Sequence, residues 1–322
     1  MVMAQSLFKA LKRREPEVSI DVLAPGWSLP LLARMPEVSQ GIEMPLGHGR
    51  FALGERRRIG RRLRGHGYDQ ALLLPNSWKS ALIPFWAGIP RRTGWRGEMR
   101  YGLLNDIRRL DRARLPMTVQ RFVALAAEAD APLPEIEPPS LQVEERAVKA
   151  ALGRLELNRS DRPLLALCPG AEYGPAKQWP PAAYGELAAR LAAQGWAVWL
   201  FGSEKDRAVC GAVNEASKGV CMDLGGRTGL ADAVDLMSLA DAVVSNDSGL
   251  MHVAAALQRP LVALYGSSDP AFTPPLNPQS RILSRRLPCS PCFKRECPLG
   301  HLDCLRGISV DEVEQALAEA TA

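Results

Sequence analysis

The sequence predicts an α/β protein of two domains, each a parallel sheet with helices on both faces. Segments of strand and helix character alternate along most of the chain. A length of 322 residues, 47% of them apolar, is enough for two ordinary hydrophobic cores. Residues 127–145 are rich in Pro and acidic residues and lack periodicity, as interdomain linkers do. We therefore expect one domain at 1–140 and another at 141–322.

The second half alternates regularly. Short apolar runs predict strands, and apolar residues at helical spacing predict the segments between them. The expected strands are 164–168, 197–202, 220–223, 241–245 and 260–265, and the expected helices are 181–194, 205–217, 229–239, 249–257 and 310–320. Ser309 and Glu312 have the spacing of a capping box at the start of the last helix.

The first half also alternates, but it begins with a helix. A doubly wound domain normally begins with a central strand, and ligands approach the turn that follows it. We therefore expect this domain to lack its first strand. The expected elements are a helix in 1–16, strands in 18–24 and 38–45, a basic helix at 55–64, a strand in 68–75 and a helix in 77–88.

Charge is unevenly distributed between the halves. Residues 1–150 hold 24 Lys and Arg against 16 Asp and Glu, a net charge of +8, while residues 151–322 hold 16 against 19, a net charge of −3. The basic half is expected to meet an anionic partner. Alternatively, residues 55–64 are the solvated face of a helix that buries Phe51, Ile59 and Leu63.

Several classes of protein are disfavoured. No window approaches the roughly 20 apolar residues of a membrane-spanning helix, so any membrane association is expected to be peripheral. The first residues do not have the pattern of a secretory signal, and we expect a reducing cytoplasm. A nucleic-acid binder would interleave aromatic residues with its arginines, and few are present here.

The stretch VVSNDSGLMHVAAAL, residues 243–257, ends a predicted strand and begins a helix. Ser248 and Gly249 start that helix, whose free N–H groups and positive dipole end favour a phosphate-like anion. His252 follows by one helical turn and faces the same way. Asp247 would accept hydrogen bonds from sugar hydroxyls. The alternative is that Asp247 and Ser248 only cap the helix and that His252 is a surface residue.

The stretch LLALCPGAEYGPAKQWP, residues 164–180, runs from a strand into a loop that contains Gly170, Gly174 and Lys177. Glycines let the backbone approach a ligand, and a lysine can neutralise a diphosphate. The spacing matches neither a P-loop nor a dinucleotide fingerprint. Glu204 follows the next strand, where an acidic side chain commonly holds ribose hydroxyls. The three turns share one sheet edge and together predict a nucleotide diphosphate ligand.

Longer stretches carry a resemblance to a known family. The segments CPGAEYGPAKQWP, SNDSGLMHVAAALQRPLVALYG, FTPP and LPNSWKSALIPFWAGIPRRTGWRGEMRYGLLND resemble the lipopolysaccharide heptosyltransferases of glycosyltransferase family 9 over nearly the whole chain. The resemblance implies a GT-B architecture of two Rossmann-like domains facing across a cleft, the later one binding ADP-heptose. It implies inverting, metal-independent transfer of L-glycero-D-manno-heptose to the first heptose of the inner core on Kdo2-lipid A.

The resemblance also implies roles for individual residues. Lys177 would contact the donor diphosphate and Glu204 the adenosine ribose. The sugar-diphosphate end would be met by Asp247, Ser248, Gly249 and His252, and Glu172 and Tyr173 would belong to the donor loop. The acceptor candidates are Asn76, Ser77, Lys79, Arg96 and Arg100, for each of which ordinary packing is the alternative.

The acceptor that the resemblance implies is strongly anionic, which fits the basic half. The enzyme would work at the cytoplasmic face of the inner membrane, and residues 55–64 could help it stay on the acidic surface. Family members begin with a strand and a Gly-rich turn that ends in a general-base aspartate, which here would lie upstream of Met1. No catalytic residue is assigned, and we expect donor binding with slow or no transfer.

The segment CSPCFKRECPLGHLDC contains Cys289, Cys292, Cys297 and Cys304, with His301 just before the last. A C-x-x-C pair is half of a common zinc site, but the second pair is spaced more loosely than zinc ribbons require. The alternatives are reduced structural thiols, a structural zinc ion, or disulfides, which a reducing compartment disfavours.

Three rival functions stay open. Within the family, a heptosyltransferase of type I or III differs only in its acceptor. A nucleotide-sugar epimerase has the same architecture, but the long match in the first half favours a transferase. A sugar-nucleotide-binding protein with little activity would also account for the donor site. Calorimetry with ADP-heptose against an oligonucleotide would separate these from a nucleic-acid binder.

Overall fold

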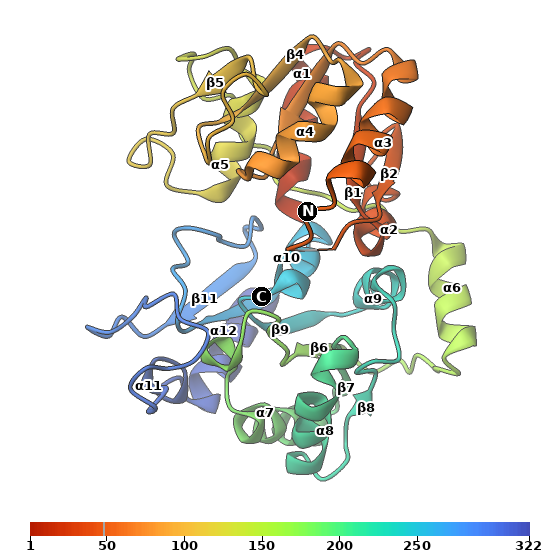
Figure 1. The fold of residues 1–322 in the computed structure, drawn as a ribbon. Helices are drawn as coiled ribbons and strands as arrows, with labels where there is room; N and C mark the ends of the chain where they lie inside the picture. Colours follow the sequence, from red (N-terminus) through yellow and green to blue (C-terminus); the bar gives the residue numbers. More distant parts are fainter. Residues whose placement is uncertain (48) are drawn as a thin grey trace. The chain divides into compact units, whose positions relative to one another are not determined.

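The structure is a computed structural model that describes residues 1–47 and 49–322 (Figure 1). Its internal contacts divide the chain into two units. The later unit consists of Met1–Gln5, Pro30–Pro36 and Pro138–Ala322, and the earlier unit of Ser6–Leu29 and Glu37–Glu137. Two short segments of the first 36 residues thus pack with the later unit, whereas a contiguous first domain was expected from the sequence.

The later unit is built on a six-stranded sheet in the order β11-β10-β9-β6-β7-β8, in which every neighbouring pair is parallel. The first strand is central, two strands follow on one side, and the other three lie on the opposite side. The chain therefore changes direction between β6 and β9. The strands are β6 (Leu164–Cys168), β7 (Ala197–Leu200), β8 (Met222–Asp223), β9 (Ala242–Asn246), β10 (Leu261–Tyr265) and β11 (Ser280–Ser284).

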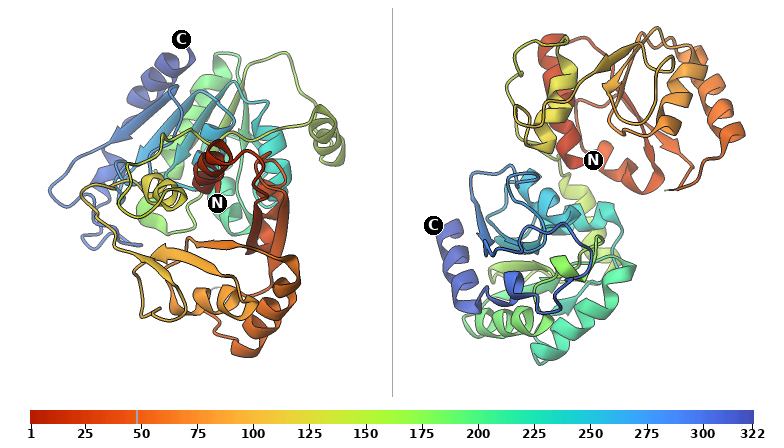
Figure 2. Two further views of the ribbon diagram at one scale, coloured as in Figure 1. Left: turned by 90° about the horizontal axis from the view of Figure 1, so that it is seen from above. Right: turned by 60° about the vertical axis from the view of Figure 1, so that its left-hand side comes forward.

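Helices cover both faces of this sheet, which confirms the predicted α/β class (Figures 1 and 2). One face carries α7 (Pro181–Ala193), α8 (Arg207–Ala216) and α12 (Val310–Thr321), with the short α11 (Asp303–Arg306) nearby. The other face carries α9 (Leu230–Met237) and α10 (Gly249–Ala256), with α6 (Glu145–Arg154) against α9. The predicted capping box opens α12, where Ser309 Oγ accepts the Glu312 N–H at 3.2 Å.

The earlier unit also pairs its strands in parallel, but in two separate sheets among the residues described. The strands β1 (Asp21–Pro25) and β2 (Gln40–Met44) form one sheet, and β3 (Gln70–Leu73), β4 (Arg91–Trp95) and β5 (Asp106–Arg108) form the other. Its helices are α1 (Gln5–Arg14), α3 (Leu53–Leu63), α4 (Trp78–Ala87) and α5 (Thr118–Val123), whereas α2 (Leu29–Leu32) lies almost entirely in the segment Pro30–Pro36 of the later unit.

The basic helix α3 buries Ile59 and Leu63 against α4, as predicted. The expectation that it also buries Phe51 is wrong, because Phe51 is 48% exposed and stacks on Trp78 at 5.9 Å between ring centroids. Arg56 is buried and donates to the Phe51 carbonyl oxygen at 2.7 Å. The exposed arginines of this region are Arg57, Arg58, Arg61, Arg62 and Arg64. Among the described residues, every helix is too short or too polar to cross a bilayer.

Candidate functional site

The site lies at the carboxyl ends of β6, β9 and β10, where the chain direction changes within the sheet. Lys177, in the loop after β6, forms an ion pair with Asp247, which directly follows β9. Ser268, in the loop after β10, donates its hydroxyl to the same carboxylate at 2.5 Å. Lys177 and Asp247 are largely buried, with side chains 17% and 6% exposed. Three loops therefore meet at the Asp247 carboxylate.

Asn246, the last residue of β9, fixes the loop that follows β6. Its side-chain amide donates to the Pro169 carbonyl oxygen at 2.7 Å. Its Oδ1 accepts the Trp179 backbone N–H at 3.0 Å and the Tyr184 hydroxyl at 3.2 Å. Residues 169–179, hereafter the donor loop, are thus fastened at both ends to one buried side chain. Sequence reasoning placed Asn246 in the turn and missed this role.

The first turn of α10 has no capping hydrogen bond from the residue that precedes it. Ser248 is the N-cap residue in an extended conformation, but its side chain makes no capping hydrogen bond. The Ser248 hydroxyl lies 3.3 Å from the Ser245 hydroxyl instead. Gly249 has free space where a Cβ would stand, with no atom within 4 Å in the part of the chain described. Ser248 is thus the N-cap by position, while its hydroxyl leaves the first N–H groups able to meet an anion.

His252 lies one turn further along α10 and is partly buried. Burial lowers its pKa to about 4, the nearby Asp247 carboxylate opposes this shift, and Lys177 adds to it. His252 is therefore neutral at pH 7 and can offer one N–H donor and one acceptor to a ligand.

Tyr173 and Glu172 shape the outer part of the donor loop. The Tyr173 ring contacts two cations, with Lys177 Nζ 5.1 Å and the Arg295 guanidinium carbon 5.5 Å from its centroid. Glu172 forms an exposed ion pair with Lys205 at 2.5 Å, which connects the loops after β6 and β7. Tyr173 thus packs beside the Lys177 ammonium, whereas the exposed Glu172–Lys205 pair contributes little to the stability of these loops.

Glu204 follows β7 at the same sheet edge, with 71% of its side chain exposed and Arg207 3.3 Å away. Its neighbour Asp206 was missed by sequence reasoning. The Asp206 carboxylate accepts the Ser203 N–H at 2.9 Å, and a Cβ at Gly170 would come within 2.4 Å of it. Gly170 is therefore needed because the loops after β6 and β7 approach closely there.

The acceptor candidates belong to the earlier unit and follow β3 and β4, whose carboxyl ends share a sheet edge. The Asn76 carbonyl oxygen accepts the Glu98 N–H at 3.1 Å, and Glu98 accepts the Trp78 N–H at 2.6 Å. Ser77 begins α4, and Lys79 is partly buried beside it. A carboxylate that sequence reasoning did not name thus occupies the α4 N-terminus.

The two arginine candidates differ. Arg96 is exposed. Arg100 is 2% exposed, and burial lowers its pKa. Its guanidinium donates to the Pro75 carbonyl oxygen at 2.8 Å, to Asn76 Oδ1 at 3.4 Å and to the Trp95 carbonyl oxygen. These contacts fit the packing alternative for Arg100, which ties the ends of β3 and β4 together.

The family model for glycosyltransferase family 9 (heptosyltransferase) matches residues 56–303. The chain belongs to this family. It is 54% identical over 294 residues to lipopolysaccharide heptosyltransferase 2 of Salmonella typhimurium, an alignment that covers 88% of this chain and 84% of that protein. The glycosyltransferase described here is therefore an enzyme whose site must activate a sugar donor.

Solved structures agree with this assignment. The structure of E. coli ADP-heptose lps heptosyltransferase II superposes with a TM-score of 0.88 at 45% identity, covering all of this chain and 95% of that one. The E. coli heptosyltransferase WaaC, solved with ADP-2-deoxy-2-fluoro heptose, superposes with a TM-score of 0.71 at 19% identity, covering 99% of this chain and 95% of that one. The second likeness supports the fold alone.

Proposed function

We propose that this glycosyltransferase transfers L-glycero-D-manno-heptose from ADP-heptose to the first heptose of the lipopolysaccharide inner core, on heptosyl-Kdo2-lipid A. The Salmonella relative is a lipopolysaccharide heptosyltransferase 2 and the E. coli relative an ADP-heptose lps heptosyltransferase II, which supports ADP-heptose as the donor and lipopolysaccharide as the acceptor. A family member of type I or III would use the same donor site with another acceptor. The observation that carries the proposal is the Lys177–Asp247 pair beside the open first turn of α10.

In this proposal, the donor diphosphate lies between Lys177 and the N–H groups that begin at Gly249. An ammonium group has three N–H donors, so the bond to Asp247 leaves others for phosphate oxygens. Asp247 and the neutral His252 would meet the sugar-diphosphate end, and Glu204 would hold the adenosine ribose.

The proposed chemistry follows from these charges. An acceptor hydroxyl attacks the anomeric carbon opposite the diphosphate, and the bond to the diphosphate breaks. Negative charge then develops on the leaving ADP, where Lys177 and the α10 N–H groups stabilise it. A carboxylate must accept the proton of the attacking hydroxyl. Because His252 is neutral, it donates a hydrogen bond without adding charge.

We further propose that the earlier unit holds the anionic acceptor at the cytoplasmic face of the inner membrane. The exposed Asn76 and Arg96 and the partly buried Ser77 and Lys79 support the acceptor assignment, since they follow neighbouring strand ends. The exposed arginines of α3 and the stacked Phe51–Trp78 pair support peripheral association. Sedimentation with vesicles of phosphatidylglycerol, compared with phosphatidylcholine, tests this; equal binding to both would contradict it.

Titration calorimetry with ADP-heptose tests the donor site. Lys177→Ala should raise the dissociation constant for ADP-heptose by roughly 10- to 100-fold, because a hydrogen bond to a charged group contributes about 1.5–3 kcal/mol. Asp247→Ala should also weaken it, since the lysine loses its partner. Lys149→Ala is the matched control, because Lys149 forms only an exposed pair with Glu145 on α6. Unchanged affinity in the Lys177 and Asp247 variants would overturn the proposed donor site.

A further inference from the structure

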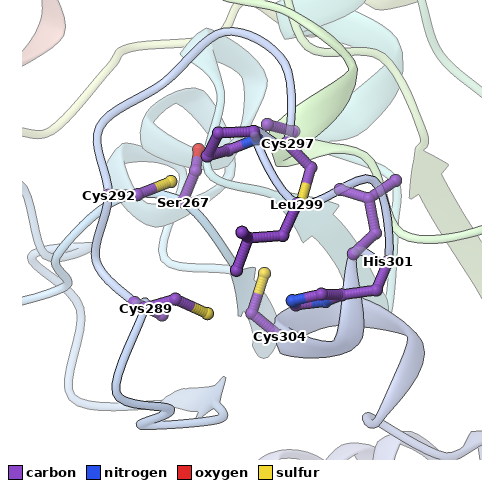
Figure 3. Close-up of a pocket in the computed structure, with 11 residues that line it drawn as sticks. Ser267, Cys289, Cys292, Cys297, Leu299, His301 and Cys304 are labelled. Carbon is purple, nitrogen blue, oxygen red and sulfur yellow. The ribbon is translucent and has the colours of Figure 1, made fainter.

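Residues 289–304, hereafter the cysteine loop, surround a small cavity. Its volume is about 20 Å³, large enough for one water molecule or one metal ion. The cavity is lined by Cys289, Cys292, Cys297, Cys304 and His301, together with residues that include Ala176 of the donor loop. Figure 3 shows the sulfur atoms of Cys289, Cys292 and Cys304 and the ring of His301 directed toward a common space. All four cysteines of the loop therefore line one cavity.

A tight turn follows Cys297 in the wall of the cavity. Gly300 closes the turn with φ +71° and donates its N–H to the Cys297 carbonyl oxygen at 3.1 Å. The turn places Cys297, Leu299 and His301 in the same cavity wall.

Four cysteines line this cavity and can supply a complete tetrahedral ligand set. His301 Nδ1 accepts the Asp303 backbone N–H at 3.0 Å, which leaves only its Nε2 for a ligand. All seven cysteines, each within the described residues, are free thiols. Among those same residues no three His, Cys, Asp or Glu side chains stand close enough to hold a metal ion as placed. Binding would therefore draw the sulfurs inward from the cavity wall.

The cysteine loop also supports the donor loop. The Ala176 N–H donates to the Arg295 carbonyl oxygen at 3.0 Å, and the Tyr173 hydroxyl donates to the Phe293 carbonyl oxygen at 2.7 Å. A Cβ at Gly174 would come within 2.5 Å of the Arg295 oxygen, so the two backbones are in close contact. The Tyr173 ring that faces Arg295 also faces Lys177. The position of the Lys177 ammonium thus depends on the cysteine loop.

The same loop reaches the strand end that carries Ser268. The Phe293 N–H donates to the Ser267 carbonyl oxygen at 2.7 Å, and the Ser290 hydroxyl donates to the Gly266 carbonyl oxygen at 2.6 Å. One loop therefore fastens both the donor loop after β6 and the loop after β10, which supply Lys177 and Ser268 to Asp247.

We propose that the cysteine loop binds one Zn²⁺ ion through the thiolates of Cys289, Cys292, Cys297 and Cys304, and that the closed loop holds Lys177 in position for the donor. Four thiolates at tetrahedral spacing are the usual ligands of structural zinc. Binding releases the thiol protons, so the site tightens as pH rises. The positioning role depends on the proposed donor site, whereas the zinc assignment does not.

Metal analysis of protein purified without chelator tests the zinc site. About one zinc per chain is expected, with loss in Cys297→Ser and retention in the control Cys221→Ser, because Cys221 lies outside the cavity. Lys177→Ala should keep its zinc, which separates this test from the donor site. Metal-free protein, iron in place of zinc, zinc retained in Cys297→Ser, or disulfides among the four cysteines would each overturn the assignment.

The positioning role is tested on the wild-type chain, so that a poorly folding variant does not decide the result. Zinc is removed with a mercurial reagent and a chelator, the thiols are restored, and ADP affinity is measured by calorimetry before and after zinc is added back. We expect the affinity for ADP to fall by about tenfold when zinc is removed and to recover when zinc is added back. Equal affinity for ADP with and without zinc would overturn the positioning role, but it would not contradict the zinc site or the proposed donor site.

Discussion

At the scale of single residues, the carboxyl-end rule for parallel strands correctly brought Lys177 and Asp247 to one sheet edge. Their pairing follows from the topology, since β6 and β9 are neighbours on either side of the change in chain direction. The rule could also have found Ser268, because the polar cluster YGSSD follows a predicted strand in the same way. It could not give the protonation state of His252, which depends on burial by residues distant in sequence.

His252 should make stability depend on pH in the acid range. Its pKa is about 4 in the folded protein and about 6.5 in an unfolded chain. The unfolded state therefore takes up a proton first, and stability is lost as pH falls from about 6.5 toward 4. Above that range His252 is neutral in both the folded and the unfolded state, so it contributes nothing to the pH dependence of stability. At pH 5 the loss should be on the order of 1–2 kcal/mol.

The measurement is the melting temperature from pH 7 to pH 5 for the wild type, His252→Gln and the control His66→Gln. His66 is exposed in the earlier unit. The His252 variant should lose less stability on acidification than the other two proteins. Melting curves that shift in parallel for all three would show that His252 does not titrate as described. The Asp247 carboxylate and Lys177 face this ring, so both must be intact in each protein compared.

At the scale of elements, the sequence predicted the strands and helices of the later unit to within a few residues, apart from β11, α6 and α11. Strands buried on both faces must be continuously apolar, and this pattern is easily recognised. Strand β11 was missed because it is a partly exposed edge strand with the sequence SRILS. Strand β4 begins with two arginines, so its sequence does not suggest a strand. Arg91 forms ion pairs with Asp106 and Glu128, and Arg92 donates to the Leu103 carbonyl oxygen at 2.6 Å.

Two glycines in adjacent helices offer a matched test of helix packing. A Cβ at Gly185 of α7 would lie 2.4 Å from the Ala216 Cβ, where α7 and α8 touch. Gly185→Ala should therefore lower the free energy of unfolding by about 1–3 kcal/mol through overpacking. Gly211 lies on the exposed side of α8, with no atom of the described chain within 4 Å. Gly211→Ala should raise the free energy of unfolding by about 0.5–1 kcal/mol.

Urea denaturation of both variants and the wild type measures this difference. Opposite shifts of the midpoint are expected with an unchanged slope, because the surface exposed on unfolding stays the same. If both substitutions stabilised the protein, α7 and α8 would not be in the close contact described.

At the scale of the whole molecule, the chain contributes to the later unit from three separate stretches. The segment Pro30–Pro36 joins that unit through Arg34, whose guanidinium bonds Asp235 of α9 at 2.6 Å. The Gln142 N–H also donates to the Arg34 carbonyl oxygen at 2.9 Å, and the Arg34 guanidinium donates to the Gln142 carbonyl oxygen at 3.2 Å. No local pattern in the sequence could predict that Pro30–Pro36 belongs to the later unit. The linker composition at 127–145 marks only one of the places where the chain passes from one unit to the other. The family resemblance gave the architecture but not this exchange of segments.

Arg34→Ala should therefore destabilise the later unit strongly. The Arg34 and Asp235 side chains are only 12% and 4% exposed. Burial raises the Asp235 pKa, and the Arg34 charge opposes that shift. Removing the arginine leaves a buried carboxylate without its partner, which should cost about 3–5 kcal/mol of unfolding free energy.

The control for this prediction is a second arginine that pairs with an aspartate of α9. Arg154 pairs with Asp232 of α9, but its side chain is 56% exposed, so Arg154→Ala should cost less than about 1 kcal/mol. Chemical denaturation followed by tryptophan fluorescence measures both. A small cost for Arg34→Ala, equal to that of the control, would mean that Pro30–Pro36 is not anchored to the later unit by this pair. A large cost restricted to Arg34 would show that the early segment is part of the unit that carries the donor site.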